Sequence, residues 1–235
     1  MPYATVLFDV GETLLHVPEP APIYRKLLSR YGRALPLEDI GTTLKEVRRV
    51  MDERVPRWVA DDLKLDCEAS TRRRWLHVDT FLSLCGLEGC ADAHADFYDL
   101  YVGTEFFTLY PDVPDALKAL KHAGYRLGIV SNWESRLLEL CSAHSIADCF
   151  DFAVVSEIEG FVKPHPHMYR RALELSGEPP DRVVHVGDSL RDDVEAAAAV
   201  GIRGILLDRT GSGSEDYEPR ITSLAELDRV LDADR

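Results

Sequence analysis

Short apolar runs alternate with helical stripes through the second half of the chain. Runs of this length, rich in valine, leucine and isoleucine, are typical of strands buried on both faces of a parallel sheet. Four of them predict strands, at residues 125–130, 152–155, 182–186 and 204–207. Between them, apolar residues recur three and four positions apart, as in helices that cover a sheet. The alternation predicts a parallel sheet with helices on both faces and right-handed crossovers.

The first half of the chain has a different pattern. One apolar run, Thr5 to Phe8, predicts a strand that delivers Asp9 at its carboxyl end. After it the apolar side chains fall on helix faces, marked by Ile23, Leu27 and Leu28; Leu44, Val47 and Met51; Val78, Phe81, Leu82 and Cys85; and Phe97, Tyr98 and Tyr101. We therefore predict an α/β fold. Its doubly wound, Rossmann-like core comprises residues 1–16 and 105–235, and residues 17–104 form an inserted α-helical domain.

Composition and charge narrow the class of protein. A chain of 235 residues, of which 46% are hydrophobic, is long and apolar enough to bury a substantial core. Its net charge of −14 disfavours nucleic acids and anionic membranes as partners, because both attract positively charged surfaces. The charge does not exclude an anionic substrate, because a metal ion can dominate the field of its own site.

The cysteines and the N-terminus predict the cellular compartment. Five cysteines without a CxxC pair indicate reduced thiols rather than a disulfide framework. The first residues lack the basic and apolar segments of a signal peptide, and no apolar run is long enough to span a bilayer. We therefore expect a cytoplasmic protein. No feature of the sequence determines its oligomeric state.

Polar residues follow four of the predicted strands at the point where each strand ends. They are Asp9 with Thr13, Ser131 with Asn132, Lys163, and Asp188 with Asp193. Taken singly, each has an ordinary structural explanation, as a helix cap, a turn former or part of a solvated loop. Ligands of open α/β sheets, however, bind beyond the carboxyl ends of the strands, so we expect these residues to converge.

As a set, these residues supply the groups that phosphoryl transfer needs. They offer a carboxylate nucleophile, hydroxyl and amide donors for phosphate oxygens, a fixed cation, and carboxylates for a hard metal ion. Three carboxylates and a phosphate dianion would repel one another strongly in a partly desolvated site. Mg²⁺ and the ammonium of Lys163 would offset most of that charge.

The order and spacing of these residues resemble the four motifs of the haloacid dehalogenase superfamily. The matching segments span most of the chain and read FDVGETL at 8–14, IVSN at 129–132, SEIEGFVKP at 156–164 and GDSLRDD at 187–193. The helical insertion after the first motif resembles the C1 cap of that superfamily. The resemblance implies a Rossmann-like hydrolase with a cap domain that acts on small phosphorylated metabolites.

The resemblance also implies a role for each residue that contacts substrate. Asp9 attacks phosphorus and becomes an aspartyl phosphate. Ser131 and Asn132 hold phosphoryl oxygens, and Thr13 is a further candidate for that role. Lys163 neutralises charge between the nucleophile and the phosphate.

The metal ligands follow from the same resemblance. Asp188, and Asp193 directly or through water, hold Mg²⁺ together with Asp9. The backbone carbonyl of Gly11 completes the implied set, and a carbonyl ligand survives any change of side chain.

One position departs from the motif. Phosphatases of the superfamily usually carry a second aspartate two places after the nucleophile, which protonates the leaving group, and this chain has Gly11 there. Glu12 is the candidate replacement, although its position favours a side chain that faces solvent or caps a turn. His16 or an acidic residue of the cap is another candidate proton donor. Loss of one general acid or base costs about two to four powers of ten in rate. We therefore expect a slow phosphatase, or one confined to good leaving groups.

Gly11 leaves two other functions open. A metal-independent 2-haloacid dehalogenase also attacks with an aspartate and lacks the second one, but the dehalogenases that this chain resembles do not keep the pair Asp188 and Asp193. They also need a cap arginine for the halide, for which the candidates are Arg25, Arg30 and Arg33. A regulatory protein that binds phosphate without turning it over is the third hypothesis.

The residues that select the substrate are less evident. The densest basic run of this acidic chain, Arg72-Arg73-Arg74-Trp75, lies in the helical insertion. We interpret it as a solvated helix face with Trp75 in the core of the insertion. The alternative is a contact with the substrate phosphate.

Overall fold

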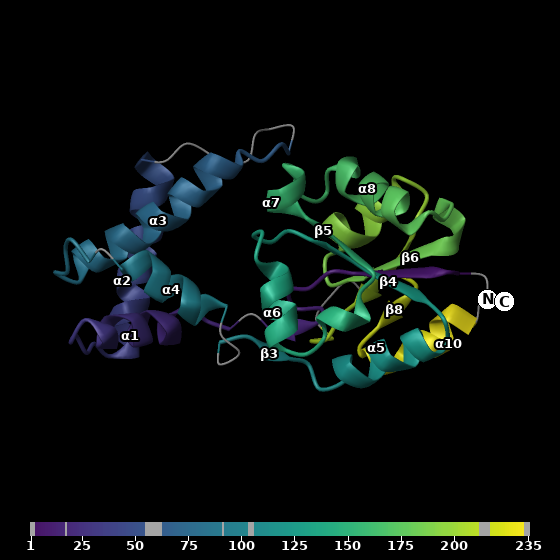
Figure 1. Cartoon of the computed structure of the whole chain (residues 1–235), viewed down its shortest axis with the longest axis horizontal. Helices are drawn as coiled ribbons and strands as arrows, with labels where there is room; N and C mark the ends of the chain where they lie inside the picture. Colours follow the sequence, from purple (N-terminus) through teal and green to yellow (C-terminus); the bar gives the residue numbers. More distant parts are fainter. Residues whose placement is uncertain are drawn as a thin grey trace.

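The computed structural model describes residues 3–16, 18–54, 63–90, 92–102, 106–211 and 217–232. Four helices, α1–α4, form one end of the molecule, and a sheet covered by helices forms the other (Figure 1). Both ends of the chain lie at the side of the sheet that is farther from α1–α4 (Figure 1). In this part of the chain no helix is both long enough and apolar enough to cross a bilayer.

The main sheet has six strands, and all of its pairings are parallel. In spatial order the strands are β5 (Phe152–Val155), β4 (Arg126–Ser131), β1 (Thr5–Phe8), β6 (Val183–Gly187), β7 (Arg203–Leu207) and β8 (Arg220–Ile221). The order runs outward from β1 to β5 and then restarts on the other side of β1 with β6. This reversal between β1 and β6 is the switch point at which ligands of such sheets bind.

Successive residues of the central strand face opposite layers, which is why its four residues are all buried. Val6 and Phe8 pack with α5 (Val113–His122), α6 (Leu137–Ala143) and α10 (Leu227–Asp232), whereas Leu7 packs with α8 (Pro166–Ser176) and α9 (Ala196–Ala198). The predicted doubly wound α/β fold is confirmed.

Shorter elements complete the core. They are the antiparallel pair β2 (Leu15–His16) and β3 (Thr108–Leu109), helix α7 (Ser156–Glu159), the 3₁₀ turns η1 (Ala147–Cys149), η2 (Pro180–Arg182) and η4 (Leu224–Glu226), and the π-helical segment η3 (Leu190–Glu195). The sequence pattern missed the two-residue strands and α10, because such short elements contain too few apolar positions to show a period. The helical stretch after β6 begins as the π-helical segment and continues into α9.

The helices α1 (Ala21–Arg30), α2 (Leu37–Arg54), α3 (Cys67–Leu84) and α4 (Ala93–Tyr101) form what we call the helical layer. They enclose a hydrophobic cluster of their own, centred on Tyr24, Leu27 and Phe81. The predicted boundaries of the inserted domain adjoin residues 17 and 103–105, which lie outside the described ranges. The division into domains therefore stays a prediction.

Candidate active site

Asp9 lies immediately beyond β1, between the ends of β4 and β6. Its backbone N–H donates to Val186 O (2.9 Å), which extends the β1–β6 pairing by one residue and fixes the direction of the side chain. The side chain is buried in the described structure, at 6% exposure for the residue. Its Oδ1 accepts hydrogen bonds from Ser131 Oγ (3.1 Å) and Lys163 Nζ (2.6 Å).

Lys163 links two carboxylates. Its ammonium also donates to Asp193 Oδ1 at 2.6 Å, so one buried cation lies between Asp9 and Asp193. Burial alone would lower the pKa of Lys163, but the charges of Asp193 and Asp9 outweigh burial and raise it. The lysine is therefore a fixed positive charge across the physiological pH range.

Asp193 is the most completely bonded carboxylate of the site. Its Oδ1 also contacts His185 Nε2 (3.0 Å), and its Oδ2 accepts from the backbone N–H of Ser189 (3.0 Å). Burial would raise the pKa of Asp193, but Lys163 and His185 lower it. This carboxyl group is therefore ionised and held in one orientation.

Asp188 stands at the mouth of the site and is exposed. One carboxylate oxygen from each of Asp9, Asp188 and Asp193 can be chosen so that all three lie within 4.8 Å of one another. Burial, and then the charges of Asp9 and Asp193, raise the pKa of Asp188 to about 7. Burial and the charge of Asp193 also raise the pKa of Asp9, although Lys163 opposes them. The site thus carries more negative charge than Lys163 offsets.

This donor set fits a hard divalent cation. Carboxylate oxygens are the ligands that Mg²⁺ and similar ions take, and three of them converge on one point. Asp9 and Asp188 have ligand capacity to spare, whereas Asp193 already accepts three hydrogen bonds. Gly11 is partly exposed in the same loop and carries a backbone carbonyl.

The predicted phosphate ligands are placed differently from one another. Ser131 is buried against Asp9, at the centre of the site. The amide of Asn132 instead bridges the backbone of Lys163, accepting from its N–H (2.7 Å) and donating to its carbonyl (3.1 Å). Thr13 is fully buried, and its Oγ1 has no hydrogen-bond partner among the described residues. The structure therefore gives Asn132 a positioning contact, and its contact with substrate stays a prediction.

Glu12 is held by side chains outside the cluster of Asp9, Asp188 and Asp193. Its carboxylate accepts a 2.5 Å hydrogen bond from Tyr110 and lies 3.3 Å from the ring of His16. Arg209 stacks over the Tyr110 ring at 3.8 Å and donates to Thr13 O, so it holds this group against the loop. Glu12 is not among the three carboxylates that converge, and a catalytic role for it is untested.

The basic run of α3 is not a uniformly solvated face. Arg74 leaves the helical layer and pairs with Glu157 of α7 (2.6 Å), with Glu134 3.8 Å away after β4. Arg72 is exposed, as expected. Trp75 is only partly buried and stacks on His94 at 4.7 Å. The interpretation of the run as a solvated face is wrong for Arg74, because two buried glutamates of the core attract it.

Sequence reasoning missed the partners that hold the site together, namely His185, Tyr110, Arg209, Glu134 and Glu157. His185 carried a usable signal, since it is the one polar residue inside the apolar run at 183–186. The others lie in loops and helices where nothing local marks them. Of the arginines considered for a halide, Arg30 pairs with Asp96 (2.5 Å) and Arg33 donates to Cys85 O (2.8 Å), within the helical layer.

The comparisons with known proteins agree with this geometry. Residues 3–201 match the haloacid dehalogenase-like hydrolase family, and the chain belongs to that family of hydrolases. The resemblance seen in the four motifs is therefore confirmed.

Individual relatives cover nearly the whole chain. Haloacid dehalogenase-like hydrolase domain-containing protein 3 of Danio rerio is 30% identical over 89% of this chain and 86% of its own length. Glyceraldehyde 3-phosphate phosphatase of Pyrococcus furiosus is 26% identical over 97% of this chain and 92% of its own length. The solved 2-haloacid dehalogenase of Pseudomonas syringae pv. Tomato DC3000 has a TM-score of 0.73 at 23% identity, and covers 99% of this chain and 100% of that one. At that identity the likeness shows the fold alone.

Proposed function

We propose that the protein is a Mg²⁺-dependent phosphatase of small phosphorylated metabolites, with Asp9 as its nucleophile. The observation that carries this proposal is the buried contact of Asp9 with Lys163, beside the convergence of Asp9, Asp188 and Asp193. The similarity to an archaeal enzyme named glyceraldehyde 3-phosphate phosphatase supports the phosphatase assignment. We also propose that the protein acts in the cytoplasm on a small molecule. Neither a nucleic acid nor a membrane is expected as a partner.

The chemistry follows from where the groups lie. A carboxylate oxygen of Asp9 attacks phosphorus, the bond from phosphorus to the leaving oxygen breaks, and an aspartyl phosphate forms. Lys163 offsets negative charge beside the attacking carboxylate, and Ser131 is placed to donate to a phosphoryl oxygen. Asp9 and Asp188, with Asp193 and the carbonyl of Gly11, would hold Mg²⁺, which would supply charge stabilisation. Attack of water on phosphorus then releases phosphate and restores the carboxylate.

Protonation of the leaving group is the weak step of this scheme. Gly11 has no side chain, and the carboxylate of Glu12 accepts a hydrogen bond from Tyr110. We therefore propose that acyl and aryl phosphates, whose leaving groups need little protonation, are the better substrates.

The second candidate is a metal-independent 2-haloacid dehalogenase, and Gly11 is the observation that favours it. Displacement of halide at carbon needs no proton donor for the leaving group. Against it, Asp188 joins Asp9 and Asp193 in a carboxylate cluster that a metal-free reaction at carbon would not require. The two functions therefore differ in their need for a divalent cation.

The test compares acetyl phosphate with 2-chloropropionate, each with Mg²⁺ and with chelator. We expect release of phosphate only with Mg²⁺, and its loss in Asp9→Asn, which removes the nucleophile and a metal ligand but leaves the melting temperature near that of the wild type. Near-normal turnover in Asp9→Asn would refute the nucleophile. Chloride release in the presence of chelator would assign the dehalogenase activity, and aspartyl phosphate that forms but does not turn over would assign the regulatory one.

A further inference from the structure

A cavity of about 490 Å³ lies within the helical layer, away from the Asp9 site. Its walls come from α1, α2, α3 and α4, together with Pro18, Pro20, Phe106 and Glu134. A volume of this size is typical of sites that hold small organic molecules. Asp9, Lys163 and the metal-ligand candidates do not line it.

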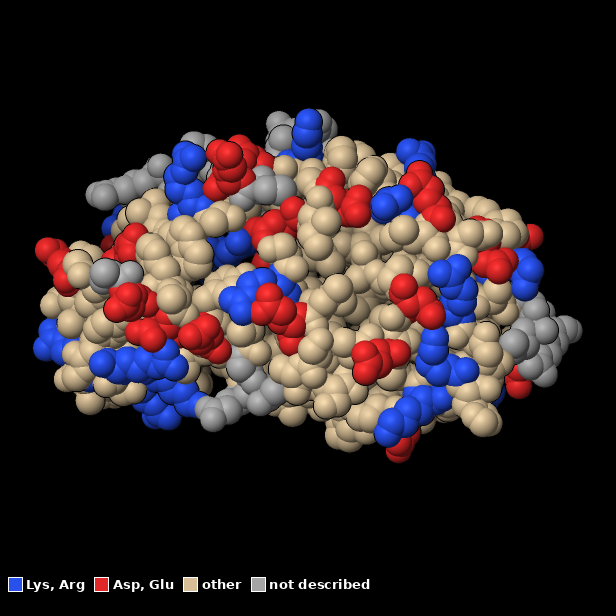
Figure 2. Space-filling model, in the orientation of Figure 1, with Lys and Arg blue, Asp and Glu red and all other residues tan. Residues whose placement is uncertain are grey.

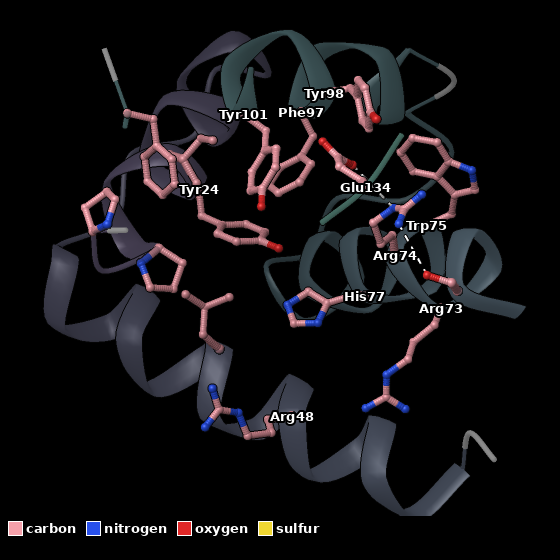
Figure 3. A pocket seen from close by; sticks show the side chains of 16 residues that line it. Tyr24, Arg48, Arg73, Arg74, Trp75, His77, Phe97, Tyr98, Tyr101 and Glu134 are labelled. Carbon is pink, nitrogen blue, oxygen red and sulfur yellow. Dashed lines mark hydrogen bonds and ion pairs between the residues drawn. The ribbon is translucent and has the colours of Figure 1, made fainter. Parts of the chain in front are cut away.

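One wall of the cavity is aromatic. Tyr24 lies 5.0 Å from Phe97, between ring centroids, and Phe97 is stacked on Tyr101 at 6.0 Å with only 24° between the planes. Figure 3 shows these three rings together on one side of the cavity, with Trp75 and Tyr98 further along it. Flat surfaces of this kind favour a flat ligand, because aromatic rings gain most contact by stacking.

The opposite wall is cationic. Arg48 projects from α2 and Arg73 from α3, on either side of His77 (Figure 3). Burial, and then the charges of Arg73 and Arg48, lower the pKa of His77 to about 4. Both guanidinium groups therefore lie close enough to His77 to lower its pKa, and near neutral pH this imidazole is uncharged and can donate or accept a hydrogen bond.

The chain as a whole is negatively charged, whereas the described residues that line the cavity carry a net positive charge. Arg48, Arg73 and Arg74 line it, and Glu134 is the single carboxylate among the described lining residues. Glu134 Oε2 lies 3.8 Å from Arg74 Nε, whereas Glu134 Oε1 has no hydrogen-bond partner among the described residues. Within the described part of the chain, Arg48 pairs with no carboxylate. An anion is the ligand that such a wall attracts.

Tyrosine hydroxyl groups add directional contacts. Tyr24 as a whole residue is only 4% exposed. In Figure 3 the hydroxyl of Tyr24 points into the cavity, as does that of Tyr101. A hydroxyl that faces the cavity can donate a hydrogen bond to a polar ligand.

We propose that this cavity is a binding site for a planar aromatic anion, with the ring against Tyr24, Phe97 and Tyr101 and the anionic group between Arg48 and Arg73. A carboxylate or phosphate accepts the paired donors of guanidinium groups, and Tyr24 donates to an oxygen of the same ligand. This binding does not depend on the proposed phosphatase activity.

Two sources of such a ligand share this chemistry. A neighbouring cavity contains Ser70, Arg74, Tyr101 and Glu134, which also line the first one, and it extends to Asn132 beside Lys163. The ligand is then either the organic part of the phosphorylated substrate or a separate metabolite. The experiment below distinguishes the two.

The test measures binding of 2-naphthoate to the full-length protein by calorimetry, without metal. Its neutral isostere 2-naphthamide tests the anionic group, and decanoate, a flexible anion of similar size, tests the planar ring. We expect 2-naphthoate to bind about tenfold or more tightly than either, the factor expected for a hydrogen-bonded charge contact. Equal affinity for 2-naphthoate and 2-naphthamide would overturn the proposal, and so would tighter binding of decanoate.

Variants tie the binding to the cavity. Arg48→Gln with Arg73→Gln should abolish the preference for 2-naphthoate over 2-naphthamide, whereas Arg72→Gln, an exposed neighbour on α3, should leave it intact. Tyr24→Phe keeps the ring in the hydrophobic cluster, removes the hydroxyl, and should weaken binding several-fold. Unchanged affinity in both the double variant and Tyr24→Phe would overturn the site. The result of the double variant is used only if its circular dichroism spectrum matches that of the wild type. If the spectra differ, the affinity of Tyr24→Phe alone tests the site.

The rates at which two naphthyl phosphates are hydrolysed distinguish the two sources of the ligand. If 6-carboxy-2-naphthyl phosphate is hydrolysed with a kcat/KM about tenfold above that of 2-naphthyl phosphate, the cavity receives the organic part of the substrate. If 2-naphthoate binds, but the two phosphates are hydrolysed equally fast or neither of them is hydrolysed, the cavity receives a separate ligand. Both results support the binding site. Acetyl phosphate, which has no aromatic part, reports a failure of the phosphatase function independently.

Discussion

At position 11 the chain has a hydrogen atom where related phosphatases have a carboxylate. Gly11 does not have a positive φ, whereas its neighbour Glu12 does, at 52°. The unusual backbone conformation of this loop is therefore at Glu12, and an L side chain at residue 11 meets no conformational penalty of that kind. Position 11 is open to a carboxylate on these grounds.

We predict that Gly11→Asp speeds turnover. With a fast phosphoryl donor, the wild type should release a burst of one enzyme equivalent and then turn over slowly, because no side chain at 11 activates water. In Gly11→Asp the burst should shrink and the steady rate should rise, by as much as about two to four powers of ten if proton transfer limits it. Stopped-flow measurements of product release check this.

The control concerns Glu12. Glu12→Gln and Tyr110→Phe both disturb the 2.5 Å hydrogen bond between these side chains. If Glu12→Gln is inactive while a stably folded Gly11→Asp is no faster, Glu12 already transfers the proton and our interpretation of Gly11 is wrong.

The lowered pKa of His77 predicts how the free energy of unfolding depends on pH. Its pKa is about 4 in the folded protein and near 6.5 when unfolded, so between these values the unfolded chain binds more protons. Stability should therefore fall as pH decreases from about 6.5 to 4, by on the order of 2 kcal/mol from this residue. The difference between the wild type and His77→Asn in urea unfolding, measured across that window, isolates the contribution. His122→Asn, at an exposed position of α5, should leave the pH dependence in place.

At the scale of elements, the site depends on how β6 passes into η3. A Cβ added to Gly187 would lie 2.2 Å from Asp193 Cγ, well inside contact distance. The absence of a side chain at 187 lets the carboxylate of Asp193 fold back under the strand end, where Ser189 N–H and Lys163 reach it. The π-helical segment places Asp193 there, and such segments recur at functional sites.

Gly187→Ala should therefore displace Asp193. We expect a loss of about 1 to 3 kcal/mol in unfolding free energy from overpacking, and an increase of tenfold or more in the Mg²⁺ concentration for half activity. Gly41→Ala is the matched control, because a Cβ at Gly41 in α2 meets nothing within 4 Å. It should raise stability by up to about 1 kcal/mol. Normal Mg²⁺ dependence in Gly187→Ala would show that the position of Asp193 does not matter to the metal.

At the scale of the whole molecule, Arg74 connects the helical layer to the sheet. It reaches Glu157, whose second oxygen accepts from Ser135 N–H, and it lies near Glu134 three residues after β4. The chain from Ser131 to Glu134 thus joins the nucleophile to the helical layer. Burial raises the pKa of Glu134, and the contacts with Tyr98 and Arg74 oppose that increase.

We predict that Arg74→Gln destabilises the protein by about 1 to 3 kcal/mol, because it leaves Glu134 and Glu157 without this cation. A double-mutant cycle with Glu157→Gln should give a coupling energy of about 1 kcal/mol. Urea unfolding of the four proteins measures it. A coupling of zero would mean that the contact contributes nothing to holding the two parts together.

The described lysines and arginines form no extended basic surface on the face of the molecule that Figure 2 shows. In Figure 2, the lysines and arginines of the described residues are interspersed with aspartates and glutamates over the face shown. The net charge of −14 adds a general repulsion toward polyanions. Enclosed positive charge is instead local among the described residues, at the buried Lys163 and along the cavity of the helical layer.

The sequence by itself determined the sheet and the residues that converge on its edge. Strand periodicity is local, and parallel strands bring their carboxyl ends to one edge, so Asp9, Ser131, Lys163, Asp188 and Asp193 were predictable as a group. Four motifs in order were enough to predict the family.

Only the tertiary structure decided how these side chains are used. Tyr110 holds Glu12 across 98 residues of sequence, and the side chain of Asn132 is hydrogen-bonded to the backbone of Lys163. The aromatic and cationic walls of the cavity come from four separate helices. Contacts of this kind depend on the packing of whole elements and on which buried polar groups find a partner. Neither leaves a periodic mark on the chain.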